Sequence, residues 1–161
     1  MKRDIDSCIY QHGKDILESE TFQSMENFMQ HGNVSVCQHS ISVALESIKF
    51  VRKFKISCDE RAVVRGALLH DYFLYDWHEK ALWHNWHGFR HPGIALQNAV
   101  KEYSISQIEG EIIKKHMWPL TIIPPLCREA WIITLVDKYV STLETVGIRK
   151  ASDMQKIPAG H

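Results

Sequence analysis

RGALLHD, residues Arg65 to Asp71, ends an apolar helical run with a histidine followed directly by an aspartate. Neighbouring side chains on a helix diverge by roughly 100°, so a hydrophobic core has little use for both of these polar groups. At a helix end the backbone turns away, and an imidazole and a carboxylate in sequence can converge on one cation. His70 and Asp71 therefore predict a metal site at the end of a helix.

The apolar residues follow a helical period along nearly the whole chain, and strand signals are almost absent. Capping boxes at Ser57-x-x-Glu60 and Ser106-x-x-Glu109 mark two helix starts. His31-Gly32 is typical of a turn, although this histidine can also line a metal cleft. Residues 75–89, rich in Trp, His and Gly, predict a functional loop that packs down as a lid or pocket wall. We expect helices over residues 4–18, 21–30, 36–54, 59–74, 91–102, 106–116 and 125–146.

Length and composition predict one all-α domain over residues 1–161, with its core at about 20–146 and a peripheral tail at 147–161. Lys+Arg and Asp+Glu are both 19, so no overall field favours a nucleic acid polymer or a membrane surface. A small phosphorylated molecule needs only a local positive spot and stays possible. The start of the chain has no secretion signal and the four cysteines are scattered, so we expect a cytoplasmic protein.

Four further candidate metal ligands lie at predicted helix interiors or ends: His39, His91, His116 and Asp137. Asp137 is the most informative, because aspartate is a poor interior helix residue and a buried unpaired carboxylate is costly. Three of the four have an ordinary alternative when taken alone. His39 can be a surface residue, His91 can cap a helix, and Asp137 can face solvent beside Lys138. Imidazole and carboxylate ligands together suit iron, manganese, zinc, cobalt or nickel.

The order H…HD…H…H…D resembles the HD superfamily of metal-dependent phosphohydrolases, in the variant whose extra histidines hold two metal ions. The resemblance covers about residues 34–146 and implies an HD-type bundle of about six to eight helices. It also implies a core metal site in which Asp71 bridges to a second ion when one is present. His84 and His87 are alternative ligands for the second ion. The residues that carry the match are His39, His70, Asp71, His91, His116 and Asp137.

The resemblance implies hydrolysis of a small phosphate ester, such as a nucleotide or related metabolite, by hydroxide activated on one or two divalent ions, with magnesium also possible. Arg65 and Lys138 are candidates for binding the phosphate, and His87 for facing the substrate. One position departs from the pattern. Many HD enzymes carry Lys, His or Glu three residues after the HD aspartate, where this chain has Leu74. Asp76 or His78 would then donate the proton to the leaving group.

Two other functions stay open at this stage: a non-catalytic HD-type module that senses a ligand, and an HD-type di-iron oxygenase. Leu74 favours the sensing module, whereas retention of every ligand favours catalysis. Two bound irons with oxygen consumption would indicate an oxygenase, and another metal with phosphate release would indicate a hydrolase. The sequence does not specify the oligomeric state.

Overall fold

The computed structural model describes residues 2–74 and 87–148. This part of the chain is all-α, as predicted, with seven α-helices and one small two-stranded hairpin. Every helix in it is too short or too polar to cross a lipid bilayer. The helices are α1 (Lys2–Leu17), α2 (Glu20–Ser24), α3 (Val36–Lys53), α4 (Glu60–Leu69), α5 (His87–Glu102), α6 (Gln107–Lys115) and α7 (Arg128–Thr145), and the strands are β1 (Met29–His31) and β2 (Val34–Ser35).

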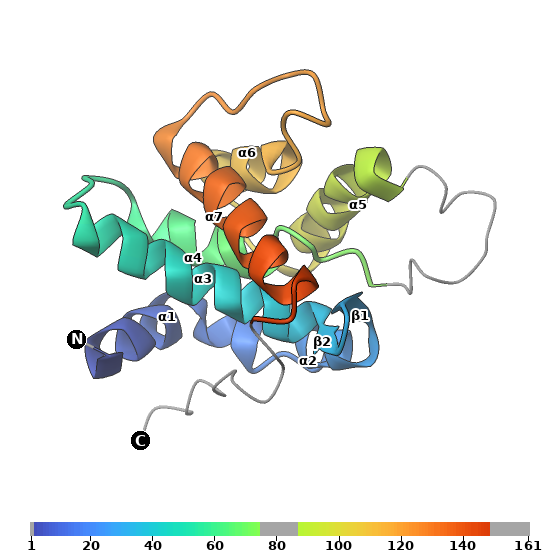
Figure 1. The fold of residues 1–161 in the computed structure, drawn as a ribbon, viewed down its shortest axis with the longest axis horizontal. Helices are drawn as coiled ribbons and strands as arrows, with labels where there is room; N and C mark the ends of the chain where they lie inside the picture. The colour runs from blue at the N-terminus through green and yellow to red at the C-terminus, as the bar shows by residue number, and fades with distance from the viewer. Residues whose placement is uncertain (1, 75–86, 149–161) are drawn as a thin grey trace.

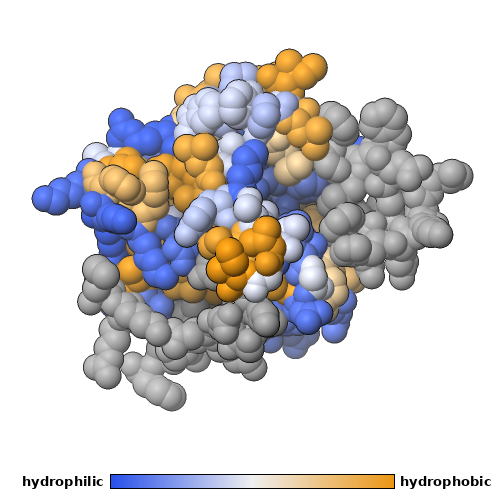
Figure 2. All heavy atoms as spheres, in the orientation of Figure 1, coloured by the Kyte–Doolittle hydropathy of each residue, from blue (hydrophilic) through white to orange (hydrophobic). Residues whose placement is uncertain are grey.

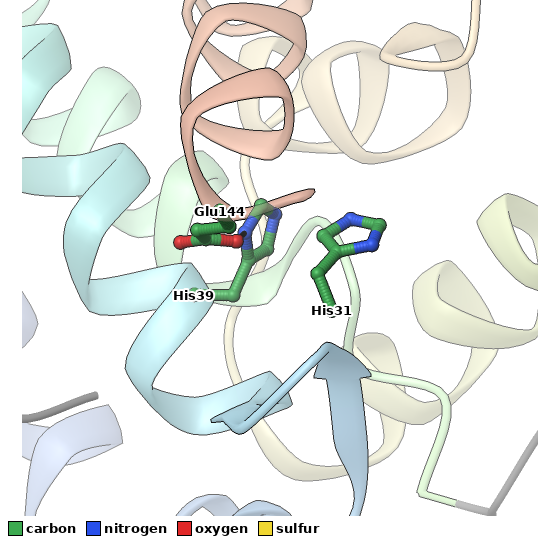
Figure 3. Close-up of side chains that lie close together, drawn as sticks. All are labelled: His31, His39 and Glu144. Carbon is green, nitrogen blue, oxygen red and sulfur yellow. Dashed lines mark hydrogen bonds and ion pairs between the residues drawn. The ribbon is translucent and has the colours of Figure 1, made fainter. Parts of the chain in front are cut away.

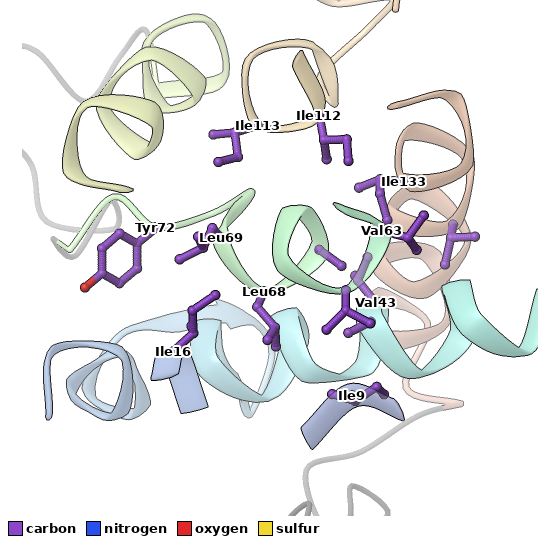
Figure 4. Packing of buried hydrophobic residues seen from close by; sticks show 14 of the residues in the cluster. Ile9, Ile16, Val43, Val63, Leu68, Leu69, Tyr72, Ile112, Ile113 and Ile133 are labelled. Carbon is purple, nitrogen blue, oxygen red and sulfur yellow. The ribbon is translucent and has the colours of Figure 1, made fainter. Parts of the chain in front are cut away.

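Helix α4 is the centre of the bundle: it packs against α1, α3, α6 and α7, while α5 lies against α6 (Figure 1). All of its residues from Ala62 to Leu69 are buried. The core around it joins side chains from the whole chain, including Ile9, Ile112 and Ile133 (Figure 4). Because α4 is surrounded in this way, its C-terminal end opens into the middle of the molecule, where His70 and Asp71 follow.

A glycine lets α4 and α6 approach closely. A Cβ added to Gly66 would lie 2.6 Å from Cδ1 of Ile112, so any larger side chain would force the two helices apart. His70 is the C-cap residue of α4 and His116 the C-cap residue of α6. The close contact between the helices therefore brings two histidines from equivalent helix ends to the same region, with ring centroids 4.9 Å apart.

The predicted helix over residues 21–30 is wrong in its second half. Helical structure stops at Asn27, and the chain then forms the hairpin β1–β2 around Gly32, whose φ is +57°. The apolar spacing that predicted the helix still buries Phe22 and Met25. The turn requires a residue with positive φ, which glycine supplies without strain.

Several helix boundaries also differ from the prediction. Helix α4 ends at Leu69 rather than residue 74, and Leu74 has a left-handed backbone with φ of +56°. Its N-cap is Asp59, whose carboxylate accepts the amide hydrogen of Ala62, so the predicted Ser57 capping box is wrong. Helix α5 begins four residues before the predicted start, and α7 begins after Cys127 rather than at residue 125. The second predicted capping box, at the start of α6, is confirmed.

Candidate metal centre

The structure brings the side chains of all six candidate ligands together. They come from five helices or helix ends: α3, the end of α4, α5, the end of α6, and α7. Each residue is at most 7% exposed, although imidazoles and carboxylates are strongly polar. Buried groups of this kind need partners or a cation, because desolvation of charge is costly. The six residues are His39, His70, Asp71, His91, His116 and Asp137.

The first half of the cluster surrounds Oδ1 of Asp137. That oxygen lies 3.0 Å from Nε2 of His39 and 3.5 Å from Nε2 of His70. Oδ2 of Asp71 faces the same two rings, at 3.8 Å from His39 and 3.3 Å from His70. Four ligand atoms from three helices thus converge on one small volume.

The second half of the cluster surrounds the other oxygen of Asp71. Oδ1 lies 3.1 Å from Nε2 of His91 and 3.4 Å from Nε2 of His116. The two nitrogens are 2.9 Å apart. A single carboxylate therefore faces two separate groups of imidazoles, one with each oxygen.

Hydrogen bonds on the outer side of three rings orient their inner nitrogens. Nδ1 of His70 donates to the carbonyl of Ala67 at 2.7 Å, and Nδ1 of His116 donates to the carbonyl of Ile113 at 2.9 Å. His39 donates its Nδ1 hydrogen to a carboxylate, described below. With the proton on Nδ1, the lone pair of each neutral ring is on Nε2 and points into the cluster. This arrangement is usual for histidines that bind metals.

Glu144 is the carboxylate behind His39, with Oε2 at 2.8 Å from Nδ1 (Figure 3). Its side chain is fully buried. Figure 3 also shows His31, which reaches from β1 toward the ring of His39; the two ring centroids are 5.7 Å apart and the rings are nearly perpendicular. The sequence predicts for His31 either a turn position or a position lining the metal cleft. In the structure His31 ends β1 at the hairpin turn, and its ring also lies against that of His39.

The electrostatics of the cluster are dominated by its two carboxylates. Burial lowers the pKa of His39, but its hydrogen bonds to Asp137 and Glu144 outweigh this and raise the pKa to about 9. Burial likewise opposes the charge of Asp71 and Asp137, yet the neighbouring imidazoles hold the pKa of both carboxyls well below the usual range. The protein alone balances these charges with protons on histidines. A divalent cation bound between these carboxylates would also supply positive charge.

The geometry fits a metal ion. Two ligand atoms that each lie ~2.1 Å from one ion are ~3.0–3.4 Å apart for angles between 90° and 109°, and four of the seven separations given above fall within this range. Nε2 of His70 and Oδ1 of Asp71 are buried without a hydrogen-bond partner among the described residues. Ligand atoms of His39, His70 and Asp71, and likewise those of Asp71, His91 and His116, lie within 4.8 Å of one another. The buried cluster is therefore compatible with a bound metal.

A pocket of about 580 Å³ opens onto this cluster. Four of the six candidate ligands line it, while His39 and His70 lie deeper. Its polar wall adds Gln30, Lys138 and Ser141, and its apolar wall is formed by Met117 and Leu120 with the intervening Pro119. Nζ of Lys138 donates to the carbonyl of His116 at 3.0 Å. Burial lowers the pKa of this ammonium group below its usual value, and the carboxylate of Asp137 only partly offsets this shift.

The apolar wall of the pocket continues into an exposed loop between α6 and α7. Ile122 and Leu126 in this loop are 92% and 79% exposed. Apolar side chains are visible at the top of the space-filling view, where this loop lies (Figure 2). The chain segment that follows the apolar lining residues therefore carries exposed hydrophobic side chains.

The structure does not bring Arg65 to the pocket. This side chain is buried on the other side of α4, where Nη1 lies 2.6 Å from Oδ1 of Asp15 and Nε lies 3.2 Å from Oε1 of Glu109. Its guanidinium is occupied by structural ion pairs, and Arg65 is not among the residues that line the pocket. Asp76 is outside the described residues. His87 begins α5, but its side chain is not among those described.

Sequence reasoning missed Gln30 and Glu144. Glu144 follows Asp137 by seven residues, which is two helical turns, so the two carboxylates share one face of α7. That spacing is a usable signal. Gln30 gave no such signal, because the sequence predicted a helix at this position and no functional contact for its side chain. In the structure β1 directs Gln30 toward Asp71.

No family model, curated protein or solved structure compared with this chain matches it.

Proposed function

We propose that the protein is a metal-dependent phosphohydrolase with two metal positions that share Asp71. The observation that carries this proposal is the division of the Asp71 carboxylate, with Oδ2 toward His39 and His70 and Oδ1 toward His91 and His116. At the metal position beside His39 and His70, Asp137 supplies a further carboxylate ligand. The order of these residues along the chain supports the same proposal, because it is the order of the HD superfamily that the sequence resembles.

The donor set supports a transition metal. Four imidazole nitrogens and two carboxylates suit manganese, iron, cobalt, nickel or zinc better than magnesium, which prefers oxygen ligands. When bound, such ions lower the pKa of a water ligand and neutralise charge on a phosphoryl oxygen.

The residues around the pocket support a small phosphate ester as substrate. The Lys138 ammonium lies beside Asp137 at the pocket wall, where it can donate to a phosphate oxygen. Met117 and Leu120, which also line the pocket, can contact an organic group attached to the phosphate. A pocket of this volume is large enough for a substrate the size of a nucleotide.

Phosphate release by metal-loaded protein tests the proposal. The purified protein is stripped with a chelator, reloaded with manganese, cobalt, nickel, zinc or iron, and assayed over a panel of phosphate esters. We expect phosphate release with at least one metal, and its loss together with bound metal in Asp71→Asn. Asp6→Asn in α1 is the control, because Asp6 does not line the pocket.

Three results would contradict the proposal that the protein is a phosphohydrolase acting at this site. Full activity and metal content in Asp71→Asn would exclude this site. Two bound irons with oxygen consumption and no phosphate release would indicate the oxygenase instead. Tight metal and nucleotide binding without turnover of any ester would indicate the sensing module.

A further inference from the structure

Gln30 links the β1–β2 hairpin directly to the shared carboxylate. Its Nε2 donates a hydrogen bond to Oδ2 of Asp71 at 2.6 Å. The amide cannot be turned around without setting its oxygen against the carboxylate oxygen, since both groups would then be acceptors. The donor therefore faces Asp71, and the amide oxygen points away from it.

The hairpin holds Gln30 in a defined place. Ser35 ends β2 and caps α3, accepting the amide hydrogen of Gln38 at 3.1 Å. The amide of Val36 donates to the carbonyl of Phe28 at 2.8 Å, which closes the base of the hairpin. Gln30 is thus fixed by the helix that also carries His39, and it contributes to the pocket wall.

Two features indicate a role beyond filling space. The hydrogen bond at Oδ2 restricts rotation of the Asp71 carboxylate, and this rotation decides whether Oδ1 keeps facing His91 and His116. In addition, Oε1 of Gln30 is buried and has no hydrogen-bond partner among the described residues. A buried acceptor without a donor is costly, and the pocket is where a water molecule can supply one.

We infer that Gln30 is a positioning residue of this site: its amide group holds the Asp71 carboxylate across both metal positions, and its amide oxygen accepts a hydrogen bond from a pocket water. This inference rests on the proposed function. An amide neither gains nor loses a proton near neutral pH, so Gln30 acts through orientation alone. Without it, the carboxylate is free to turn both oxygens toward one position, and the second position is weakened.

Calorimetric titration of the metal-free protein with Mn²⁺ tests this inference. The variants are Gln30→Met, which keeps the length and removes both polar atoms, and Gln30→Glu, which keeps the shape and removes the donor. The control is Gln107→Met, at an exposed position at the start of α6. We expect both Gln30 variants to bind the second Mn²⁺ about 10–100-fold more weakly, with the first ion less affected. Gln107→Met should match the wild type.

The kinetic readout separates positioning from a structural role. In Gln30→Met we expect kcat to fall by about 10–100-fold with KM nearly unchanged, and circular dichroism and Tm to stay close to those of the wild type. Wild-type Mn²⁺ affinity and kcat in both Gln30 variants would overturn the inference and leave the proposed function intact. Tighter Mn²⁺ binding by Gln30→Glu would also overturn it, because residue 30 would then lie close enough to be a ligand. If the wild type binds none of manganese, cobalt, nickel, zinc or iron, the proposed function and this inference both fail.

Discussion

The carboxylate of Glu144 and the imidazole of His39 lie 2.8 Å apart although 105 residues separate them in the sequence. On the other side of the same ring, Nε2 lies 3.0 Å from Asp137. Both carboxylates belong to α7, so one helix holds the ring of another from two sides. The direction of the inner nitrogen is consequently set by the packing of α3 against α7.

Glu144→Gln should weaken metal binding while leaving the fold intact. The glutamine keeps an oxygen that accepts from Nδ1 of His39 but loses the negative charge that makes the ring a stronger ligand. We expect about tenfold weaker Mn²⁺ binding, measured by calorimetry on metal-free protein. Glu20→Gln, at the exposed start of α2, is the matched control. Equal affinity in both variants would mean that Glu144 does not support the site.

The metal-free protein should lose stability as the pH rises from about 7 to about 9. The pKa of His39 is raised from 6.5 to about 9 in the folded protein, so its protonated form stabilises the fold fully below 6.5 and progressively less as the pH rises through 9. The pKa of His70 is raised as well, since the carboxylates of Asp71 and Asp137 outweigh its burial. The loss attributable to His39 is at most about 3 kcal/mol.

Urea unfolding of chelator-treated protein at both pH values measures this effect. Mn²⁺-loaded protein should not show the loss, because a metal-bound Nε2 carries no proton in this range. A free energy of unfolding that is constant or rises with pH in the metal-free protein would contradict the assigned charge balance.

Lys138→Met should weaken phosphate binding and leave metal binding unchanged. The ammonium group lies at the pocket wall and donates only to backbone carbonyls of His116 and Thr134 among the described residues. Loss of one charge-assisted hydrogen bond to phosphate costs about 1.4 kcal/mol, which is tenfold in affinity. Calorimetry with inorganic phosphate on Mn²⁺-loaded protein measures it, with Lys114→Met on α6 as the exposed control. An unchanged dissociation constant would remove Lys138 from the phosphate site.

Arg65→Met should destabilise the protein without affecting the metal centre. The side chain of Glu109 is fully buried and pairs with Arg65, whose own side chain is 4% exposed. Removing the arginine leaves this buried carboxylate poorly compensated, at a cost of about 3 kcal/mol. Arg61 pairs with the same carboxylate from a half-exposed position, so Arg61→Met should cost less than about 1 kcal/mol. Denaturant unfolding measures both, and a larger loss in Arg61→Met would reverse this ranking.

Most helices and several of the clustered side chains were predictable because their signals are local, whereas His39 and His91 joined the predicted set through the order of residues that resembles the HD superfamily. His70, His116 and the capping serine at 106 all lie at helix ends, where the apolar period stops and polar residues are otherwise unexplained. Asp137 stands out because nothing in an apolar helix needs a carboxylate. Such signals need no knowledge of distant contacts.

The predictions that were wrong or incomplete concern contacts between segments that are distant in the sequence. The hairpin replaces a predicted helix because Gly32 turns the chain and Phe28 then pairs with Val36, a competition that helical spacing alone does not reveal. Gln30 acquires its role only through that hairpin. Arg65 was a candidate for binding phosphate because of its positive charge, but it lies five residues before His70 on α4 and faces α1 and α6 instead.

Anomalous diffraction at the manganese absorption edge, from crystals soaked in Mn²⁺, tests the central claim most directly. We expect two peaks on opposite sides of the Asp71 carboxylate, each ~2.0–2.3 Å from its imidazole nitrogens: one beside His39 and His70, the other beside His91 and His116. Peaks confined to surface carboxylates, with none at these four rings, would contradict it.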